Sequence, residues 1–230
     1  MGVCNKVYVY DVSVFSDREL FDKFYGQMDD KRKEKIDRFK NASDKYLSLG
    51  AGVLLKTVLS DVGIRDYELK YGKNDKPYLE GDSGLFFNLS HSGKYAIMTI
   101  SDREVGIDIE KNKKFEDSLI KHIFDEEEIS FANDILSGAE TFSATCSRNA
   151  DVLYTGMWTA KESVMKFFGI GLGMDPVKIH LEMNEDMQCL KATAREHDCS
   201  GLFIHRYELG DYQISVCSEY ETYGGIIPIG

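Results

Sequence analysis

The chain has 230 residues, of which 43% are hydrophobic and 29% are charged, so it can bury a good globular core. Its formal net charge of −11 argues against general nucleic-acid binding, which needs clustered Lys and Arg. No apolar run approaches the roughly 18 residues that span a membrane, and the N-terminus lacks the apolar core of a signal peptide. The five cysteines are scattered without a CxxC pair, which indicates neither a zinc ribbon nor a disulfide framework and favours the reducing cytoplasm.

The first part of the chain alternates strand and helix patterns. Val7–Val14 is rich in β-branched and aromatic side chains and predicts a strand, and Arg18–Tyr25 predicts a helix. The charged segment Asp29–Lys40 is either a solvated helix face or a local basic patch. Ser43 is a candidate N-cap for a helix that carries an apolar stripe and ends near Gly63.

Four short strands are expected next, at residues 67–71, 77–79, 85–91 and 95–100. The third ends in Ser90 and His91, which serve either as a polar turn or as hydrogen-bond donors to an anion. Neighbouring side chains of a strand point to opposite faces, and the chain has no GxSxG motif. The pair therefore does not predict a hydrolase triad.

The segment Val105–Glu110 predicts a strand with two carboxylates on one face. Side chains two positions apart in a strand share a face, so Asp108 and Glu110 point one way and Ile107 and Ile109 the other. Two close carboxylates repel each other unless a cation or a proton lies between them. Hard oxygen ligands of this kind suit Mg²⁺. The alternative is an exposed acidic face on an edge strand.

Helices dominate the next part of the chain. Phe115–Ile135 predicts one or two helices, the second opened by Asp125–Glu128, and Ser137–Asp151 predicts a loop. Thr155–Phe168 predicts a helix that ends at the glycines of residues 169–173, which form a C-cap and turn rather than a dinucleotide fingerprint because they follow a helix. The remainder predicts four strands, at residues 178–183, 188–194, 201–209 and 212–218.

An internal similarity indicates the architecture. Gly93–Ser101 and Gly210–Ser218 match at their Gly, Tyr, Ile and Ser positions. We therefore expect an α+β fold of two similar α/β lobes related by a pseudo-twofold, with an N-terminal lobe at residues 1–103 and a C-terminal lobe at residues 104–230. A ligand cleft is expected between the lobes, and we expect a monomer because one chain supplies both sides of that cleft.

The predicted helix before the glycines offers a further part of the acidic site. Trp158, Glu162 and Lys166 share one helix face, and Lys161 lies about 100° away on the same turn. One reading is a favourable ion pair on a solvated helix, with Trp158 and Met165 in the core. Combined with the two strand carboxylates, however, Glu162 supplies a third ligand for Mg²⁺, and Lys166 supplies a positive charge for a phosphate ester.

Together these segments resemble a known family. GIDIE (106–110) followed by WTAKESVMK (158–166) is similar to the paired signature of the 4′-phosphopantetheinyl transferase superfamily, and most similar to its larger, two-lobe type. Three further segments resemble motifs of the family in the same order and spacing: KRKEKIDRF (31–39), Lys76-Pro77-Tyr78 (76–78) and NLSHSG (88–93).

The resemblance implies an enzyme that moves the 4′-phosphopantetheine group of coenzyme A onto a serine of an apo acyl or peptidyl carrier protein and releases 3′,5′-ADP. It implies that Asp108, Glu110 and Glu162 hold Mg²⁺, with Mn²⁺ as the alternative because both ions take oxygen ligands. Glu162 then accepts the proton of the serine hydroxyl, directly or through a metal-bound water, and Lys166 stabilises the diphosphate. Lys161 either assists or faces solvent.

The same resemblance implies a set of residues that contact coenzyme A, namely Arg32, Lys35, Lys76, Ser90, His91, Asp108 and Lys166. A protonated His91 would add positive charge at the 3′-phosphate. The chain departs from the family where Asp75 replaces the usual Gly. Tyr46 and Leu47 replace residues that often lie near coenzyme A, so no contact is assigned to them. Ser118–Glu128 resembles the region that receives the carrier protein.

Two alternatives stay open: another Mg²⁺-dependent phosphoryl transferase that uses the same carboxylates, and a non-catalytic homologue that binds coenzyme A or a carrier. The net charge of −11 opposes encounter with an acidic carrier. Docking is therefore expected to use local basic patches or apolar contacts and to depend weakly on salt. Neither nucleic acid nor a membrane is expected as a partner.

Overall fold

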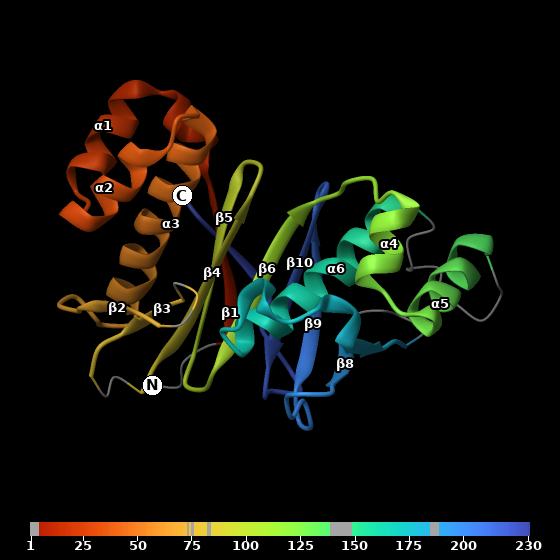
Figure 1. The fold of residues 1–230 in the computed structure, drawn as a ribbon. Helices are drawn as coiled ribbons and strands as arrows, with labels where there is room; N and C mark the ends of the chain where they lie inside the picture. Colours follow the sequence, from red (N-terminus) through yellow and green to blue (C-terminus); the bar gives the residue numbers. More distant parts are fainter. Residues whose placement is uncertain (1–4, 73, 75, 82–83, 139–148, 185–188) are drawn as a thin grey trace.

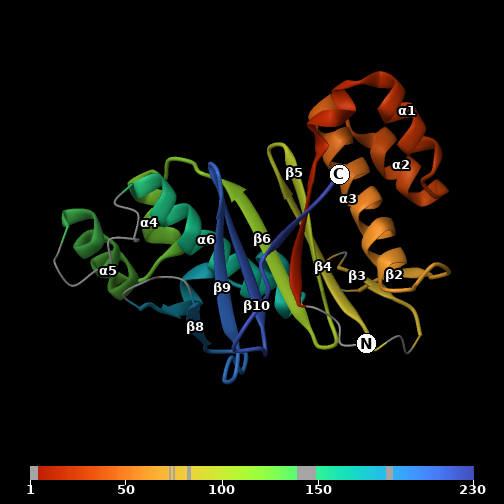
Figure 2. The same ribbon diagram turned by 180° about the vertical axis from the view of Figure 1, so that it is seen from behind.

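The computed structural model describes residues 5–72, 74, 76–81, 84–138, 149–184 and 189–230. Two β-sheets stand side by side, with α3 packed on one and α6 on the other (Figures 1 and 2). The helices α1 and α2 lie against α3, and α4 and α5 lie near the other end of the molecule, beside α6. The expectations for the first four residues, for Asp75 and for most of the loop at 137–151 lie outside the described residues. Among the described helices, none combines the length and the apolar character that a membrane crossing requires.

The first sheet has four strands in the order β11-β1-β5-β4. They are β1 (Lys6–Asp11), β4 (Phe86–Ser92), β5 (Tyr95–Ser101) and β11 (Ile226–Ile229). The helix α3 (Ala42–Asp61) packs across β5 and β1 and is buried continuously from Leu47 to Leu55, because the sheet covers one side of it and other helices cover the rest. The remaining elements of this lobe are η1 (Val12–Ser16), α1 (Arg18–Gly26), α2 (Asp30–Arg38), β2 (Leu69–Tyr71) and β3 (Pro77–Leu79).

The second sheet has five strands in the order β6-β10-β9-β8-β7. They are β6 (Val105–Lys111), β7 (Ile179–Glu182), β8 (Cys189–Ala194), β9 (Phe203–Leu209) and β10 (Tyr212–Ser218). The helix α6 (Ala150–Phe167) lies across β6 and β10 (Figure 1). The other elements of this lobe are α4 (Asp117–Ile123), α5 (Glu126–Ser137), η3 (Gly171–Gly173) and η4 (Pro176–Lys178).

An apolar core fills the space between the two sheets. It joins aliphatic side chains of the first sheet to aliphatic side chains of the second: Val7, Val9, Ile97, Ile107, Ile109, Ile214 and Val216. The alternation predicted for the acidic strand is thereby confirmed, because both of its isoleucines face this core. Burial of this apolar surface holds the two lobes together.

The two lobes repeat one hairpin. Gly93 opens the turn between β4 and β5 with φ +56°, and Gly210 opens the turn between β9 and β10 with φ +59°, a region that glycine adopts without strain. The next strands begin with Tyr95 and Tyr212, whose rings meet edge to face with centroids 5.0 Å apart. Equivalent residues touch each other when they lie near a twofold axis. The predicted α+β fold of two similar lobes is confirmed.

Two predicted helix starts are wrong. The N-cap of α3 is Asn41 rather than Ser43, which lies inside the first turn. The helix α6 begins at Ala150, five residues before the predicted Thr155, because the side chain of Asn149 accepts the backbone N–H of the first turn. The sequence signal of the α3 start is weak because its first turn is polar and lies near the surface.

The strand β11 was not predicted. It contains Pro228, which argues against a strand interior, and it pairs in parallel with β1 at the edge of the first sheet. A segment from the end of the chain thus completes the N-terminal sheet, and the division into lobes at residue 104 stays a prediction.

Candidate active site

The acidic strand β6 lies directly against α6, and Gly106 sets how closely they approach. A Cβ at Gly106 would lie 2.1 Å from the carbonyl oxygen of Ser163, so a larger residue would push the helix away. Asp108 is two residues further along and shares this face of β6. The close contact therefore brings Glu162 and Lys166 of α6 beside Asp108.

Asp108 is the carboxylate best suited to hold a cation. Its side chain is buried, and its Oδ1 accepts hydrogen bonds from Lys166 Nζ at 2.6 Å and from Ser90 Oγ at 2.9 Å. Its Oδ2 is also buried and has no hydrogen-bond partner among the described residues. An unpaired buried carboxylate oxygen costs about 1–3 kcal/mol or more. A divalent cation would remove that cost, so the donors present here fit Mg²⁺.

Glu110 lies at the more open end of the same face. Its Oε2 accepts a hydrogen bond from Ser92 Oγ at 3.1 Å, and its Oε1 lies 3.3 Å from Lys113 Nζ. Both carboxylate oxygens are therefore held, one by a neutral donor of β4 and the other by a flexible, exposed lysine.

Glu162 is half-buried in the negative field of the strand carboxylates. Burial raises the pKa of Glu162 to about 7, repulsion by Asp108 and Glu110 adds to this effect, and attraction to Lys166 opposes it. The site thus holds more negative charge than its own lysines neutralise. A carboxyl group with a pKa near neutrality is also suited to accept a proton at physiological pH.

The predicted metal ligands do not form the tightest ligand cluster of the structure. In the described part of the chain, the one group of three metal-binding side chains with all ligand atoms within 4.8 Å is Asp125, Glu128 and His180. Glu128 is already saturated there, because its two oxygens accept hydrogen bonds from Lys161 and from two backbone N–H groups. That group is therefore an ion-pair network, and the metal site at β6 and α6 stays a prediction.

Positive charge gathers around the end of β4. Lys166 Nζ donates to Ser90 Oγ at 2.8 Å as well as to Asp108. The next residue, His91, has an exposed side chain, yet desolvation by the surrounding protein lowers its pKa, and the charges of Lys166 and Lys35 lower it further. The structure thus brings together four of the predicted coenzyme A residues on β4, α2 and α6. A phosphate group bound there would favour the protonated imidazole.

Arg32 does not face this group. It lies one helical turn before Lys35 on α2, and its Nε would be 3.4 Å from a Cβ at Gly52 of α3. It lines a separate hollow of about 450 Å³ between the two helices, which none of the other predicted site residues lines. The predicted contact of Arg32 with coenzyme A stays a prediction and would require a different side-chain conformation.

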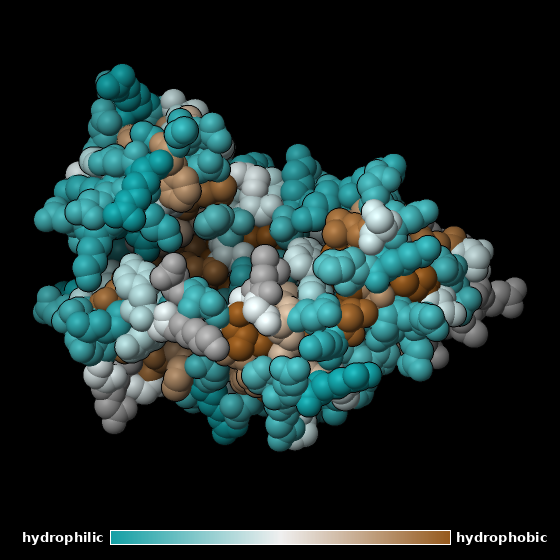
Figure 3. Space-filling model, viewed as in Figure 1, coloured by the Kyte–Doolittle hydropathy of each residue, from teal (hydrophilic) through white to brown (hydrophobic). Residues whose placement is uncertain are grey.

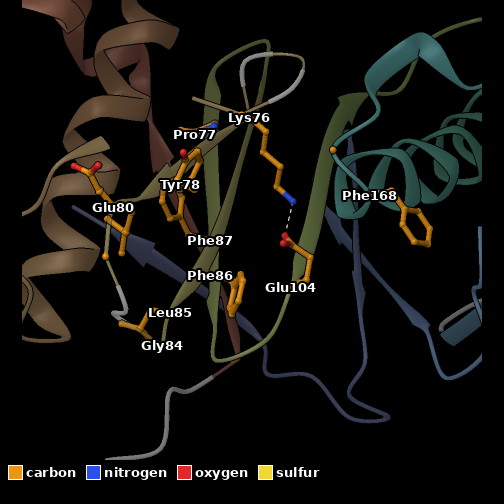
Figure 4. Close-up of a pocket in the computed structure, with 14 residues that line it drawn as sticks. Lys76, Pro77, Tyr78, Glu80, Gly84, Leu85, Phe86, Phe87, Glu104 and Phe168 are labelled. Atoms are coloured by element: carbon orange, nitrogen blue, oxygen red, sulfur yellow. Dashed lines mark hydrogen bonds and ion pairs between the residues drawn. The ribbon is translucent and has the colours of Figure 1, made fainter. Parts of the chain in front are cut away.

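Lys76 lies between the lobes and is directed at the end of α6. Its Nζ lies 2.5 Å from Glu104 Oε1 (Figure 4). It also donates to the carbonyl oxygens of Lys166 at 2.8 Å and Phe167 at 3.2 Å. A cation at a helix C-terminus is favourable because the last carbonyl groups lack partners within the helix. A phosphate at Lys76 would have to compete with these acceptors, and the predicted contact stays a prediction.

A cavity of about 570 Å³ lies beside Lys76, between the hairpin β2–β3, the start of β4 and the end of α6. Tyr78 and Phe86 line it from the first lobe, and Phe168 lines it from the second (Figure 4). Figure 3 shows hydrophobic side chains in the middle of a mostly hydrophilic surface, where the lobes meet. The expected cleft between lobes is thus largely apolar on this side.

Lys161 has a structural role, which corrects the expectation that it assists catalysis or faces solvent. It is fully buried, and its Nζ donates to Glu128 Oε2 at 2.6 Å and to the carbonyl oxygens of Ile123 at 2.9 Å and Pro176 at 3.1 Å. All three hydrogens of the ammonium group therefore have acceptors. Lys161 ties α6 to α5, to the end of α4 and to η4.

Three residues around the carboxylates were not assigned by the sequence. Asn88 and Ser92 lie two positions on either side of Ser90 on β4, and Lys113 follows the acidic strand. The only sequence signal is the polar alternation at residues 88, 90 and 92, which places these three side chains on one face of a strand. The partners of Asn88 and Ser92 in the other lobe cannot be predicted from the pattern of one strand.

Two family models match this chain. The model described as the 4′-phosphopantetheinyl transferase superfamily matches residues 104–217, and the model described as 4′-phosphopantetheinyl transferase, N-terminal, matches residues 16–102. The chain is 27% identical over 225 residues to 4′-phosphopantetheinyl transferase Sfp of Bacillus subtilis (strain 168), which covers 91% of this chain and 92% of that protein. It is 24% identical over 210 residues to 4′-phosphopantetheinyl transferase gsp of Aneurinibacillus migulanus, covering 90% and 82%.

A human protein is also similar. L-aminoadipate-semialdehyde dehydrogenase-phosphopantetheinyl transferase of Homo sapiens is 26% identical over 161 residues, which cover 66% of this chain and 52% of that protein. The chain belongs to the 4′-phosphopantetheinyl transferase superfamily. Its similarity to Sfp over nearly the full length of both chains assigns it to the Sfp-like type. The predicted family and the prediction of a transferase enzyme of this class are confirmed.

Proposed function

We propose that this enzyme transfers the 4′-phosphopantetheine group of coenzyme A to a serine of an apo acyl or peptidyl carrier protein, in a Mg²⁺-dependent reaction that releases 3′,5′-ADP. The names of the relatives support the group transferred. One observation carries the chemistry: Oδ2 of Asp108 is buried without a hydrogen-bond partner among the described residues, and Asp108 lies beside Glu162, whose pKa is raised by burial and by repulsion from Asp108.

The metal requirement follows from the donors present. Asp108, Glu110 and Glu162 would hold Mg²⁺, or Mn²⁺ in its place, because three oxygen donors with excess negative charge suit a hard divalent cation. When bound, the ion acts as a Lewis acid on phosphate oxygens.

The phosphates of coenzyme A would bind along β4 and α2, where Ser90, His91 and Lys35 supply a hydroxyl and positive charge. Arg32 and Lys76 are the further candidates, although Arg32 lines a separate hollow and Lys76 already binds Glu104 and the end of α6. Lys166 would serve both sides of the site, because its ammonium group touches Asp108 and Ser90 at once.

The transfer itself requires one proton acceptor. The carrier serine oxygen forms a bond to the β-phosphorus of coenzyme A, and the bond from that phosphorus to the oxygen bridging to the α-phosphate breaks. Glu162 takes the serine proton. 3′,5′-ADP leaves with the bridging oxygen and the bonding electron pair, and Lys166 stabilises the charge that develops there.

The carrier would dock near α4 and the start of α5, the segment Ser118–Glu128. Leu119 is an exposed apolar residue on α4. Exposed lysines precede it at 111, 113 and 114, after the acidic strand. These features supply the local basic and apolar contacts expected of an enzyme with a net charge of −11. Action as a monomer in the cytoplasm is part of the same proposal.

The test is the intact mass of two apo carrier proteins, one from fatty-acid synthesis and one from peptide synthesis, after incubation with the enzyme, coenzyme A and Mg²⁺, with and without a chelator. The expected result is a chelator-sensitive gain of one phosphopantetheine group on a carrier. No gain on either carrier, with coenzyme A binding intact, would favour the non-catalytic alternative. Phosphoryl transfer to a substrate other than a carrier would favour a different transferase.

A further inference from the structure

The two sheets meet along strands that share no backbone ladder. β4 is at the edge of the first sheet and β6 is at the edge of the second. Three alternate side chains of β4, which we call the polar ladder, bridge the gap: Asn88, Ser90 and Ser92. Asn88 Oδ1 accepts the backbone N–H of Ile107 at 2.9 Å, and the other two members donate to the carboxylates of Asp108 and Glu110.

The last member of the polar ladder has a fixed hydrogen-bond direction. The backbone N–H of Lys111 donates to Ser92 Oγ at 3.2 Å, and a backbone N–H can only donate. The proton of the Ser92 hydroxyl is therefore free to point at Glu110 Oε2, 3.1 Å away. Ser92 thus links the β6 backbone at Lys111 to the Glu110 carboxylate and fixes the position of that carboxylate relative to the strand.

Glu110 needs such a support more than Asp108 does. Its side chain is 30% exposed and has several rotatable bonds, and its other charged contact is the exposed Lys113. Without Ser92, the pull of Lys113 and of water would draw the carboxylate away from Asp108. Hydrogen bonds to metal-ligating carboxylates orient them, and their loss typically weakens metal binding about 10–100-fold.

We propose that Ser92 is a positioning residue that presents Glu110 to the divalent cation, an inference that rests on the proposed function. Ser92 acts from the strand that also carries Ser90 and His91. The metal ligand and the phosphate-binding residues are thereby held in one register across the two lobes. Asn88 fixes that register at the other end of the polar ladder.

The test measures Mn²⁺ binding without turnover, by the electron paramagnetic resonance signal of free Mn²⁺ in the presence of coenzyme A and no carrier protein. Ser92→Ala should raise the Kd for Mn²⁺ about 10-fold or more, and Ser92→Thr should restore it because the hydroxyl is retained on a residue that strands favour. The affinity for coenzyme A measured in a chelator should be the same in all three proteins.

Ser215→Ala is the matched control. Ser215 pairs with Asp108 across β10 and β6 and is fully buried, but its hydroxyl bonds Thr159 instead of a carboxylate. It should leave the Kd for Mn²⁺ within about twofold of the wild-type value, since the hydroxyl that is removed bonds Thr159 and not a carboxylate of the metal site. An unchanged Kd in Ser92→Ala, or an equal loss in Ser215→Ala, would overturn the role of Ser92. A wild-type protein that binds no Mn²⁺ would overturn the proposed metal site and this inference with it.

Discussion

Two lysines of α6 form ion pairs that are alike in length and opposite in setting. Lys161 Nζ lies 2.6 Å from Glu128, and Lys166 Nζ lies 2.6 Å from Asp108. The side chains of the first pair are both 0% exposed, whereas those of the second are 26% and 7% exposed. The first pair has an acceptor for every ammonium hydrogen and a donor for each carboxylate oxygen.

The second pair is incomplete, because one oxygen of Asp108 has no partner among the described residues. Burial raises the pKa of Glu128 and lowers that of Lys161, so desolvation opposes the first pair and its dense hydrogen bonds offset the cost. A short ion-pair distance alone therefore does not separate a structural pair from a functional pair at this helix. The two pairs differ instead in whether a polar atom lacks a hydrogen-bond partner among the described residues, as Asp108 Oδ2 does and the Glu128 oxygens do not.

The largest expected effect lies at Glu162, beside the incomplete pair of Lys166 and Asp108, which we call the open pair. Glu162→Gln should reduce the rate of carrier modification about 10²–10⁴-fold, because the amide cannot accept the serine proton. Coenzyme A affinity, measured by calorimetry, should change little. Glu34→Gln, an exposed change on α2, is the control and should leave the rate unaltered. Unchanged turnover in Glu162→Gln would remove this residue from the mechanism and leave the open pair without a function.

The complete pair of Lys161 and Glu128, which we call the closed pair, should matter for stability and not for catalysis. Lys161→Met should lower the free energy of unfolding by about 3–5 kcal/mol, because Glu128 would remain buried without its cation. Lys166→Met should lower it less, by about 1–3 kcal/mol, because Lys166 is partly exposed and Ser90 still donates a hydrogen bond to Asp108. Urea denaturation of both variants measures the difference.

A double variant tests the cause of the loss at Lys161. Lys161→Met combined with Glu128→Leu should recover part of the stability, because no uncompensated charge remains. Equal losses of unfolding free energy in Lys161→Met and Lys166→Met would mean that the two pairs contribute equally to stability, in spite of their different burial.

The approach of α6 to β6 supplies a third, smaller effect. Gly106→Ala should destabilise the protein by about 1–3 kcal/mol, because its Cβ would collide with the backbone of α6. It should also slow carrier modification by moving the open pair apart. Gly26→Ala is the matched control, since nothing lies within 4 Å of its Cβ position. Thermal unfolding and the transfer assay together check both parts. A shift in stability without a loss of rate would show that the spacing of helix and strand does not control the site.

The smallest expected effect is a pH dependence of the stability, which arises from Asp125 beside the closed pair. Burial alone would raise the pKa of Asp125, but hydrogen bonds from the Glu128 backbone and from His180 lower it on balance below the model-compound value of 3.8. The stabilisation from this carboxylate is therefore complete above pH 3.8 and is lost as the pH falls through the lower folded-state pKa.

Asp125→Asn keeps a capping side chain at the start of α5 and removes the charge. It should cost about 0.5–1 kcal/mol at pH 7, and this difference from the wild type should shrink as the pH is lowered below about 4. Urea titrations at several pH values measure it. A difference that stayed constant with pH would assign the effect to the cap alone.

Much of the site could be predicted from local patterns. The alternation at 107–110 predicted that the two isoleucines share a face, and their place in the core confirms it. The four-residue spacing predicted that Glu162 and Lys166 share one helix face, and in the structure Lys166 binds Asp108. These patterns depend on a single strand and a single helix. Lys161 escaped prediction because its burial depends on α4, α5 and η4, which lie elsewhere in the sequence.

The same dependence on local patterns explains which parts of the fold were predicted. The hairpins of β4–β5 and β9–β10 have local turn signals at their glycines, and all four of their strands were predicted. β11 has no local signal, because its short, proline-containing segment becomes a strand only through pairing with β1. The polar ladder was missed for a related reason, since its partners belong to the other lobe.

The return of β11 to the first sheet bears on how the chain is synthesised. β1 lies between β5 and β11, so one edge of β1 stays open until residue 229 has been made. An open strand edge invites pairing with other chains. Residues 1–103 expressed alone would therefore present that edge permanently, and we expect such a fragment to aggregate unless the segment 226–229 is supplied as a peptide.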